Sequence, residues 1–503
     1  MSANERTFGL YTTSVGNKDE HGSAPLGNAN FPDDPNRYGN HNKKSNSREL
    51  DFAHNHDNGL PDQLASVQRY VLLLDGTLLT SMLQFGQIYP VNVSSIFPIR
   101  AVDEIMKQES WNAKLTGSVL VLSAFFLPLS TSITGTLFPL AAILSLFSDR
   151  WKKKWRIIIS HPVAIFLTAF VLLYVVGIFY SPAPQQDILH RFLKLSTLVC
   201  AAALLMGFIC ESYWKRYILN AFLMAMLITL TLSYIKYFFH PSWLPHSRFD
   251  HASVFKDHIV QNFLMVITAF IFLYQYARKF NFRWFYGLLT IAAIFNVFFI
   301  SDGRSGYFIF GALLLYTGIL YFGWRGLFSS LLVAVVLSGL AFHLSHEFRI
   351  RIIQIVSDAE HYQQGLVNTS VGIRIQSIKN AYLLFKEKPW FGHGTGSFHT
   401  VYATLSQDQT KATGIISLAY NSYLNVGVEL GFLGIAFILL NFILQWKYSF
   451  LLPEEYCYLI QILLMSMIIG CLANPWLSDT TELHLYALFL VMSFSRKDLN
   501  ECY

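Results

Sequence analysis

The chain has 503 residues, of which 53 % are hydrophobic, 16 % aromatic and only 14 % charged. Soluble globular domains carry about 25 % charged residues, so this composition excludes a protein whose whole surface faces water. The charges are also unevenly placed, because 10 basic and 13 acidic residues lie within the first 115 positions. The sequence therefore predicts an aqueous extension followed by a membrane domain.

The first part of the chain is polar. Residues 1–66 are rich in Asn, Asp, Gly, Pro and His and contain no apolar run long enough for a core, which predicts a disordered extension. The first 20 residues lack the apolar stretch of a signal peptide, so no signal peptide is expected there. Residues 67–114 are more apolar but are interrupted by Gly76 and Pro90. They are interpreted as an interfacial or buried segment that precedes the membrane domain.

Residues 115–494 contain repeated apolar intervals of membrane-spanning length. A span needs about 20 predominantly apolar residues to cross about 30 Å of hydrocarbon. The predicted spans are two short ones within 115–148, then 157–179, 189–209, 217–238, 259–277, 284–300, 306–321, 327–344, 422–444, 456–473 and 483–494. We therefore expect an all-α polytopic membrane protein with about 12 transmembrane helices.

The loops between these spans give the expected orientation. Cytoplasmic loops carry the excess of Lys and Arg, so the basic loops around 150–156, 215–216 and 278–283 are placed inside. The short loops on the other side hold only four basic residues, namely Arg191, Arg248, Lys256 and Arg304. This alternation predicts that both termini, including the tail 495–503, are cytoplasmic. The long interval 345–419 is then expected to be a periplasmic loop.

Basic residues at the outer ends of spans are candidates for function. An arginine there is an exception to the positive-inside rule, and burying its charge costs free energy of desolvation. Arg304 lies in the turn SDGRSG (301–306), whose glycines would let a bulky ligand approach the backbone; the alternative is a surface pair with Asp302. Arg191 belongs to a second basic cluster, with His190 and Lys194, whose alternative role is snorkelling to the headgroups.

The outer loop holds a further concentration of polar features. Arg374 begins a stretch, 373–385, whose apolar spacing predicts an amphipathic helix lying along the membrane. The segment PWFGHGTGSF (389–398) follows, and its three alternating glycines could form a nest of backbone N–H groups that binds an anion. A plain loop is the alternative. A nucleotide site is not expected, because no Walker lysine follows the glycines and the loop faces outward.

These features together favour a lipid-anchored pyrophosphate as ligand, because arginine forks bind phosphate oxygens bidentately. The outer acidic residues are scattered along the sequence, which does not predict a metal site. A metal-independent reaction without a cofactor, in which arginines neutralise the leaving group, is the economical interpretation.

Several of these motifs resemble the O-antigen ligase and O-antigen polymerase superfamily. Similar stretches are Arg304 in its turn, the Arg374 helix, PWFGHGTGSF (389–398), NSYL (421–424) and VELGFLG (428–434). VFKDHIVQ (254–261) and FLPLS (126–130) are similar to stretches of the ligase branch. The resemblance covers about 114–494, and residues 1–110 lie outside it.

The resemblance implies a GT-C-like glycosyltransferase of the bacterial inner membrane with its active site on the periplasmic face. The donor would be an undecaprenyl-diphosphate-linked glycan, and the acceptor of a ligase would be a lipid A-core sugar. Arg304 and Arg374, with Arg191 and His258, would bind the donor diphosphate during an inverting attack. Membrane lipids are the other expected partners, and no nucleic acid is expected.

Two other classes of function stay open. An O-antigen polymerase or a protein O-oligosaccharyltransferase would share the donor site, and the segment 254–261 favours the ligase. A transporter of lipid-linked glycans is the non-enzyme alternative. It would be expected to show internal repeats, which the sequence lacks.

The sequence departs from the family at one catalytic position. The residue before Asn421 is usually His, but here it is Tyr420, whose reference pKa near 10 makes it a poor base. Either Tyr420 only hydrogen-bonds the acceptor beside Asn421, or an imidazole replaces the missing one, or the chemistry is lost or altered. The candidate imidazoles are His393, His399 and His258. Glu429, within a span, is expected to pair with an arginine or to orient Asn421.

Overall fold

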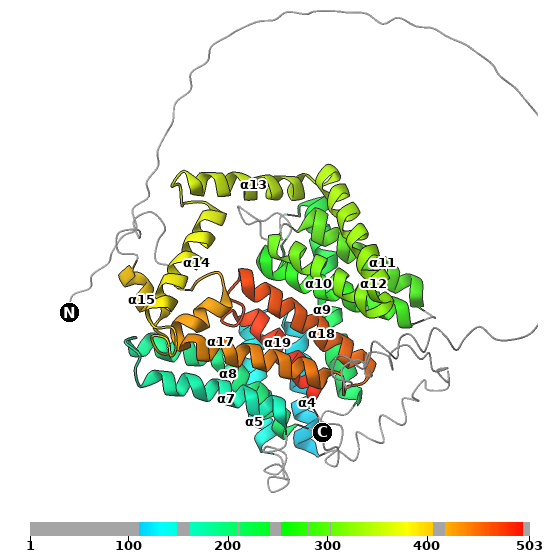
Figure 1. The fold of residues 1–503 in the computed structure, drawn as a ribbon. Coiled ribbons are helices and arrows are strands. Elements are labelled where there is room, and N and C mark those ends of the chain that lie inside the picture. Colours follow the sequence, from blue (N-terminus) through cyan, green and yellow to red (C-terminus); the bar gives the residue numbers. More distant parts are fainter. Residues whose placement is uncertain are drawn as a thin grey trace, which may run out of the picture. The chain divides into compact units, whose positions relative to one another are not determined.

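The computed structural model describes residues 110–147, 161–208, 212–241, 253–279, 282–301, 303–405 and 418–495. All regular elements in these ranges are helices, as Figure 1 shows. The helices are α4 (Trp111–Phe126), α5 (Thr131–Leu146), α7 (Pro162–Ile178), α8 (Gln185–Gly207), α9 (Ser212–Phe239), α10 (His258–Arg278), α11 (Arg283–Phe295) with the π-turn η2 (Asn296–Ile300), α12 (Arg304–Leu344), α13 (His346–Gln363), α14 (Ser370–Glu387), α15 (Phe398–Leu405), α17 (Ser422–Ser449), α18 (Glu454–Ala473) and α19 (Thr480–Phe494). The predicted extension 1–66, nearly all of 67–114 and the tail after residue 495 lie outside the described residues.

The apolar helices agree with the prediction of a polytopic membrane protein. Seven of them are long and apolar enough to cross a bilayer: α8, α9, α10, α11 with η2, α12, α17 and α18. Three shorter apolar helices, α5, α7 and α19, accompany them. The described part of each predicted span falls mainly on these helices or on α4, whereas 157–160, at the start of one span, lies outside the described residues. The total of about 12 spans stays a prediction.

Helix α12 is a pair of helical segments joined by a reversal. Gly323 has φ +58° and ψ −141°, which interrupts the helical backbone. A Cβ on Gly326 would overlap the carbonyl of Gly318, so these two residues touch. Eight residues of continuous helix would separate them by about 12 Å. The chain therefore turns back on itself, as expected for the separate predicted spans 306–321 and 327–344.

Helix α17 is broken at Gly431, where φ is +67°. The break exposes backbone groups that the preceding loop satisfies. The N–H groups of His393 and Gly394 donate to the carbonyls of Val428 and Glu429 at 2.8 Å, and the N–H of Phe432 donates to the carbonyl of Pro389 at 2.6 Å. Broken helices are tolerated in membrane proteins where neighbouring groups satisfy the freed backbone in this way. The loop 389–397 is thus part of the membrane domain.

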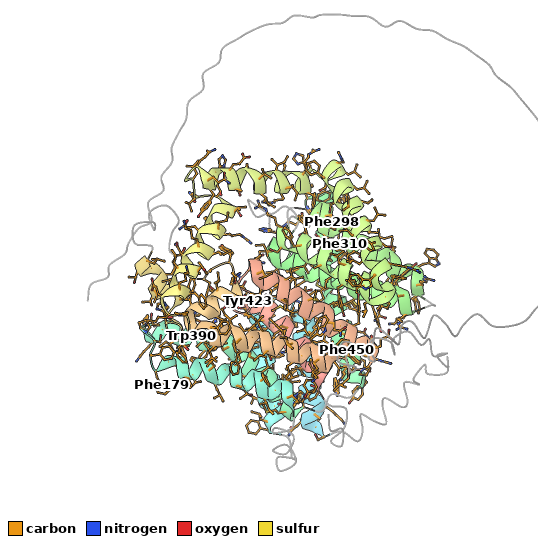
Figure 2. The ribbon with its side chains drawn as sticks, in the orientation of Figure 1. Phe179, Phe298, Phe310, Trp390, Tyr423 and Phe450 are labelled. Atoms are coloured by element: carbon orange, nitrogen blue, oxygen red, sulfur yellow. The ribbon has the colours of Figure 1, made fainter. Side chains whose placement is uncertain are left out.

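Aromatic packing fixes the segments that surround the candidate site. Phe298 of η2 and Phe310 of α12, both labelled in Figure 2, meet edge to face at 5.1 Å between ring centroids. Trp476, in the turn between α18 and α19, lies 4.2 Å from the ring of Phe263 in α10. Its ring also covers Gly470, where any Cβ would overlap it. The turn between α18 and α19 is therefore held against α10.

In the described part of the segment predicted as the outer loop, 345–405, the helices are α13, α14 and α15, and α13 and α14 lie along one margin of the apolar helices in Figure 1. Helix α14 confirms the helix predicted over 373–385. It begins after Thr369, whose hydroxyl accepts from the N–H of Gly372 at 3.0 Å, and it ends before Pro389. It packs against both α13 and α17. This packing places Arg374 near the start of α17.

Candidate functional site

Several helices begin around one cavity of about 750 Å³, here called the main cavity. Its lining comes from the starts of α5, α10 and α19, from α8 and α14, and from the residues before α17. The polar lining residues include Thr131, Lys194, Asp257, Tyr420, Asn474, Asp479 and Glu482. Asp257 already caps the start of α10 by accepting from the N–H groups of Ile259 and Val260, so the groups that favour a negatively charged ligand are the arginines at the margin of the cavity.

Arg374 lies at the margin of this cavity in a defined orientation. Its Nη1 donates to the carbonyl of Ala473 at 3.1 Å and to Oδ1 of Asn474 at 3.4 Å. Its guanidinium carbon stacks 4.6 Å from the ring centroid of Tyr420. Burial lowers the pKa of Arg374; Tyr420 opposes this effect and the nearby Arg304 adds to it. The guanidinium is thus anchored on three sides.

Arg304 is the first residue of α12 and lies near the same turn. Its Nη2 donates to Oε1 of Gln354, in α13, at 3.0 Å. The neighbouring Ser305 hydroxyl accepts from Nδ2 of Asn474 at 3.0 Å, so Asn474 connects the surroundings of the two arginines. Among the described residues, neither Arg304 nor Arg374 forms an ion pair with a carboxylate. Two such cations close together can bind a doubly charged ligand.

The glycines beside Arg304 serve packing, so the prediction that they admit a ligand is wrong. A Cβ on Gly306 would overlap the side chain of Asn262 in α10. A Cβ on Gly303 would lie 2.8 Å from the carbonyl of His258. These glycines therefore let α12 start directly against α10, which also brings His258 to the side of the site that holds Arg304.

Tyr420 and Asn421 lie where α17 begins. The Tyr420 ring lines the main cavity. Asn421 caps the helix: its Oδ1 accepts from the N–H of Leu424 at 2.9 Å, and its Nδ2 donates to the carbonyl of Leu472 at 2.9 Å. The amide of Asn421 is therefore engaged in holding α17 to the end of α18, and its catalytic role stays a prediction.

His393 is turned away from the main cavity. It is buried, and its Nε2 lies 3.0 Å from the carbonyl of Leu384, near the end of α14. The backbone N–H groups of its loop are also occupied. That of Thr395 donates to the carbonyl of Gly177 at 3.1 Å, and that of Gly396 donates to Oε1 of Glu429 at 3.2 Å. The prediction of an anion-binding nest for an external ligand is therefore wrong, because protein groups fill it.

A second cavity, here called the side cavity, has a volume of about 230 Å³. One face of α8 lines it through Asp187, His190, Arg191 and Lys194, whose spacing of three and four residues places them together. Gly396, Phe398, His399, Leu418 and Glu429 line the opposite side. Lys194 and Leu418 line both cavities, so the side cavity adjoins the main one.

Arg191 is held in a buried ion pair within this wall. Its Nε lies 2.9 Å from Oε2 of Glu429, and the two side chains are 6 % and 2 % exposed. The guanidinium also donates to the hydroxyls of Tyr174 and Ser478. The expectation that Glu429 pairs with an arginine is confirmed. Because Arg191 is already neutralised, its predicted role in binding the donor diphosphate finds no support in this arrangement.

The sequence did not predict that Asp479 and Lys256 lie in or next to the main cavity with shifted pKa values. Burial raises the pKa of Asp479 to about 6; Lys194 opposes this rise and Asp257 adds to it. Burial lowers the pKa of Lys256, next to the cavity, to about 8. Both residues lie in short segments directly before predicted spans, which is the signal that could have drawn attention to them.

In the described ranges, no group of three or more His, Cys, Asp or Glu is placed to hold a metal ion.

Comparison with known proteins identifies the domain that contains these arginines. Residues 289–439 match the family model described as O-Antigen ligase, a range that includes Arg304, Arg374 and Tyr420. No curated protein matches the chain. The match to the family model supports the resemblance of the chain to the O-antigen ligase and polymerase superfamily, whose members are glycosyltransferase-like membrane enzymes, and it does not separate the ligase from the polymerase.

Proposed function

We propose that this protein transfers a glycan from undecaprenyl diphosphate to a lipid A-core sugar on the periplasmic face of the bacterial inner membrane. The observation that carries the proposal is a pair of arginines, Arg304 and Arg374, that have no carboxylate within ion-pair distance among the described residues and lie beside a polar cavity at the ends of membrane helices. A diphosphate anchored by a lipid tail has the charge and the location that this arrangement fits.

The reaction follows from the placement of these charges. An acceptor hydroxyl attacks the anomeric carbon, and the bond to the diphosphate oxygen breaks with its electron pair staying on the diphosphate. Guanidinium groups that stabilise this developing negative charge lower the barrier most where water is excluded. Attack from the face opposite the leaving group inverts the anomeric centre. Arg304 and Arg374 serve as the electrophilic groups, so the proposed reaction needs no metal ion.

Tyr420 is proposed as the positioning residue of Arg374, because its ring supports the guanidinium at 4.6 Å. Tyr420→Phe keeps the aromatic face and is expected to retain most transfer activity. Tyr420→Ala removes a cation–π contact of about 1 kcal/mol, so transfer should fall by about fivefold to tenfold. Initial rates of glycan transfer by the purified variants measure both effects.

Tyr382→Ala provides the matched control for this experiment. Tyr382 also carries a cation over its ring, Lys386 at 5.2 Å, but it is exposed on α14 and lines neither cavity. Its loss should leave transfer unchanged. A Tyr420→Phe variant as inactive as Tyr420→Ala would show that the hydroxyl, and not the stacking, is required.

The glycolipids of a deletion strain decide between the possible acceptors. For a ligase we expect lipid A-core without attached polymer, together with accumulation of the lipid-linked polymer. Lipid A-core capped by single repeat units would instead identify a polymerase. Loss of glycan from a surface protein, with normal lipid A-core, would identify a protein O-oligosaccharyltransferase. Restoration by the wild-type gene is the control in each case.

A further inference from the structure

The side cavity has the chemistry of a sugar subsite. Its volume is about 230 Å³, and acidic, basic and imidazole side chains line it. Such a mixture of donors and acceptors matches the hydroxyls of a carbohydrate better than it matches an anion, because Arg191 is already neutralised by Glu429. The shared residues Lys194 and Leu418 place this cavity directly beside the main one.

One wall of the side cavity contains a histidine with a carboxylate partner. Nδ1 of His399 lies 3.5 Å from Oδ2 of Asp187, and the two side chains are 45 % and 32 % exposed. A carboxylate beside Nδ1 favours the proton on that nitrogen and leaves Nε2 as the proton acceptor. Contacts of this kind are often long without substrate and shorten in the complex.

The other two candidate imidazoles, His393 and His258, and the cavity histidine His190 lack this combination. His393 has a carboxylate partner, with Oε2 of Glu387 3.8 Å from its Nε2, but it is buried against the carbonyl of Leu384 and lines neither cavity. His258 lines neither cavity, although the residues on both sides of it line the main one. His190 lines the side cavity, but among the described residues no carboxylate lies within ion-pair distance of it. Of these four histidines, only His399 both lines a cavity and has a carboxylate within ion-pair distance.

We propose that the side cavity binds the acceptor sugar and that His399, oriented by Asp187, is the general base that replaces the histidine missing at Tyr420. This inference rests on the proposed glycan transfer and names the base for it. Nε2 of His399 takes the proton of the acceptor hydroxyl while the hydroxyl oxygen forms its bond to the anomeric carbon. The bond from that carbon to the diphosphate breaks, and the lipid diphosphate leaves with the electron pair. The imidazolium then releases its proton to water.

Substitutions of His399 test this role directly. A positioned general base contributes about 10²-fold to 10⁴-fold, so His399→Gln should lower kcat by at least about a hundredfold. Asp187→Asn keeps the imidazole but removes its charged partner, so a smaller loss of about tenfold is expected. The assay uses the purified full chain in lipid nanodiscs, with undecaprenyl-diphosphate-linked glycan and lipid A-core. Thermal stabilisation of each variant by undecaprenyl diphosphate alone should equal that of the wild type.

Chemical rescue separates a base from a structural residue. His399→Ala leaves space in the cavity wall, and added imidazole should restore transfer in proportion to its unprotonated fraction. His361→Gln is the matched control, because His361 is exposed on α13 and lines neither cavity; its activity should match the wild type. Full activity of His399→Gln, or a folded His399→Ala variant that imidazole does not rescue, would overturn the proposal for His399. A wild-type protein that transfers no glycan would instead contradict the proposed function, and the inference with it.

Discussion

Replacing Arg374 by alanine is expected to lower glycan transfer by at least about a hundredfold to a thousandfold, the usual effect of losing one group that stabilises transition-state charge. Arg374→Lys should also be strongly impaired, because a lysine lacks the planar fork that spans two phosphate oxygens. The structure holds this guanidinium in place through Ala473, Asn474 and Tyr420 without using its charge in an ion pair. Transfer rates and binding of undecaprenyl diphosphate, measured on the same preparations, test the prediction.

A matched control and a double variant sharpen this test. Lys386→Ala removes a cation from the same helix at a position that lines neither cavity, so it should transfer normally. If Arg304 and Arg374 bind the same diphosphate, the double alanine variant should lose much less than the product of the two single losses. Normal binding of undecaprenyl diphosphate by Arg374→Ala would count against its proposed role.

Replacing Glu429 by alanine is expected to destabilise the folded protein by about 3–5 kcal/mol, because the charge of Arg191 would be left buried without its partner. The same substitution removes the acceptor of the Gly396 N–H. The double variant Arg191→Met/Glu429→Leu buries no charge, so it should be more stable than either single variant. Thermal unfolding of the detergent-solubilised protein measures the differences.

An exposed ion pair provides the comparison for this effect. Arg278 and Glu454 pair at the ends of α10 and α18, with side chains 47 % and 38 % exposed. Exposed pairs contribute at most about 1 kcal/mol, so Glu454→Ala should change the unfolding temperature little. Equal losses for Glu429→Ala and Glu454→Ala would show that burial does not determine the cost here.

The sequence predicted the helices of the membrane domain well, because apolar runs of span length have few alternative structures. It also predicted Arg304 as a site residue, since a charge at the outer end of a span is costly, and Arg374 through its place in the outer-loop helix; the role of both in binding the donor stays a prediction. The sequence did not predict the break in α17, because nothing distinguishes Gly431 from any other small residue within an apolar run. The partner that makes this break stable, the loop 389–397, is joined to it only in three dimensions.

Contacts between distant residues explain the other differences. Nothing near Asp187 in the sequence indicates that it meets His399, because the two lie on α8 and α15. Likewise, the glycines of 392–396 have the spacing of an anion nest, but the carboxylate that one of them binds belongs to the protein, on Glu429. The local pattern predicts that these backbone N–H groups can bind an anion, but their partner depends on contacts that form only in the folded protein.

The break at Gly431 also divides α17 into two segments of unequal length. From Phe432 to Ser449 the helix is about 27 Å long at 1.5 Å per residue, close to the hydrocarbon thickness of about 30 Å. The segment after the break is therefore long enough to cross a bilayer without the nine residues that precede it. Trp390, labelled in Figure 2, lies against this break, and both it and Phe391 are about two-thirds exposed, as expected for aromatic side chains among lipid headgroups.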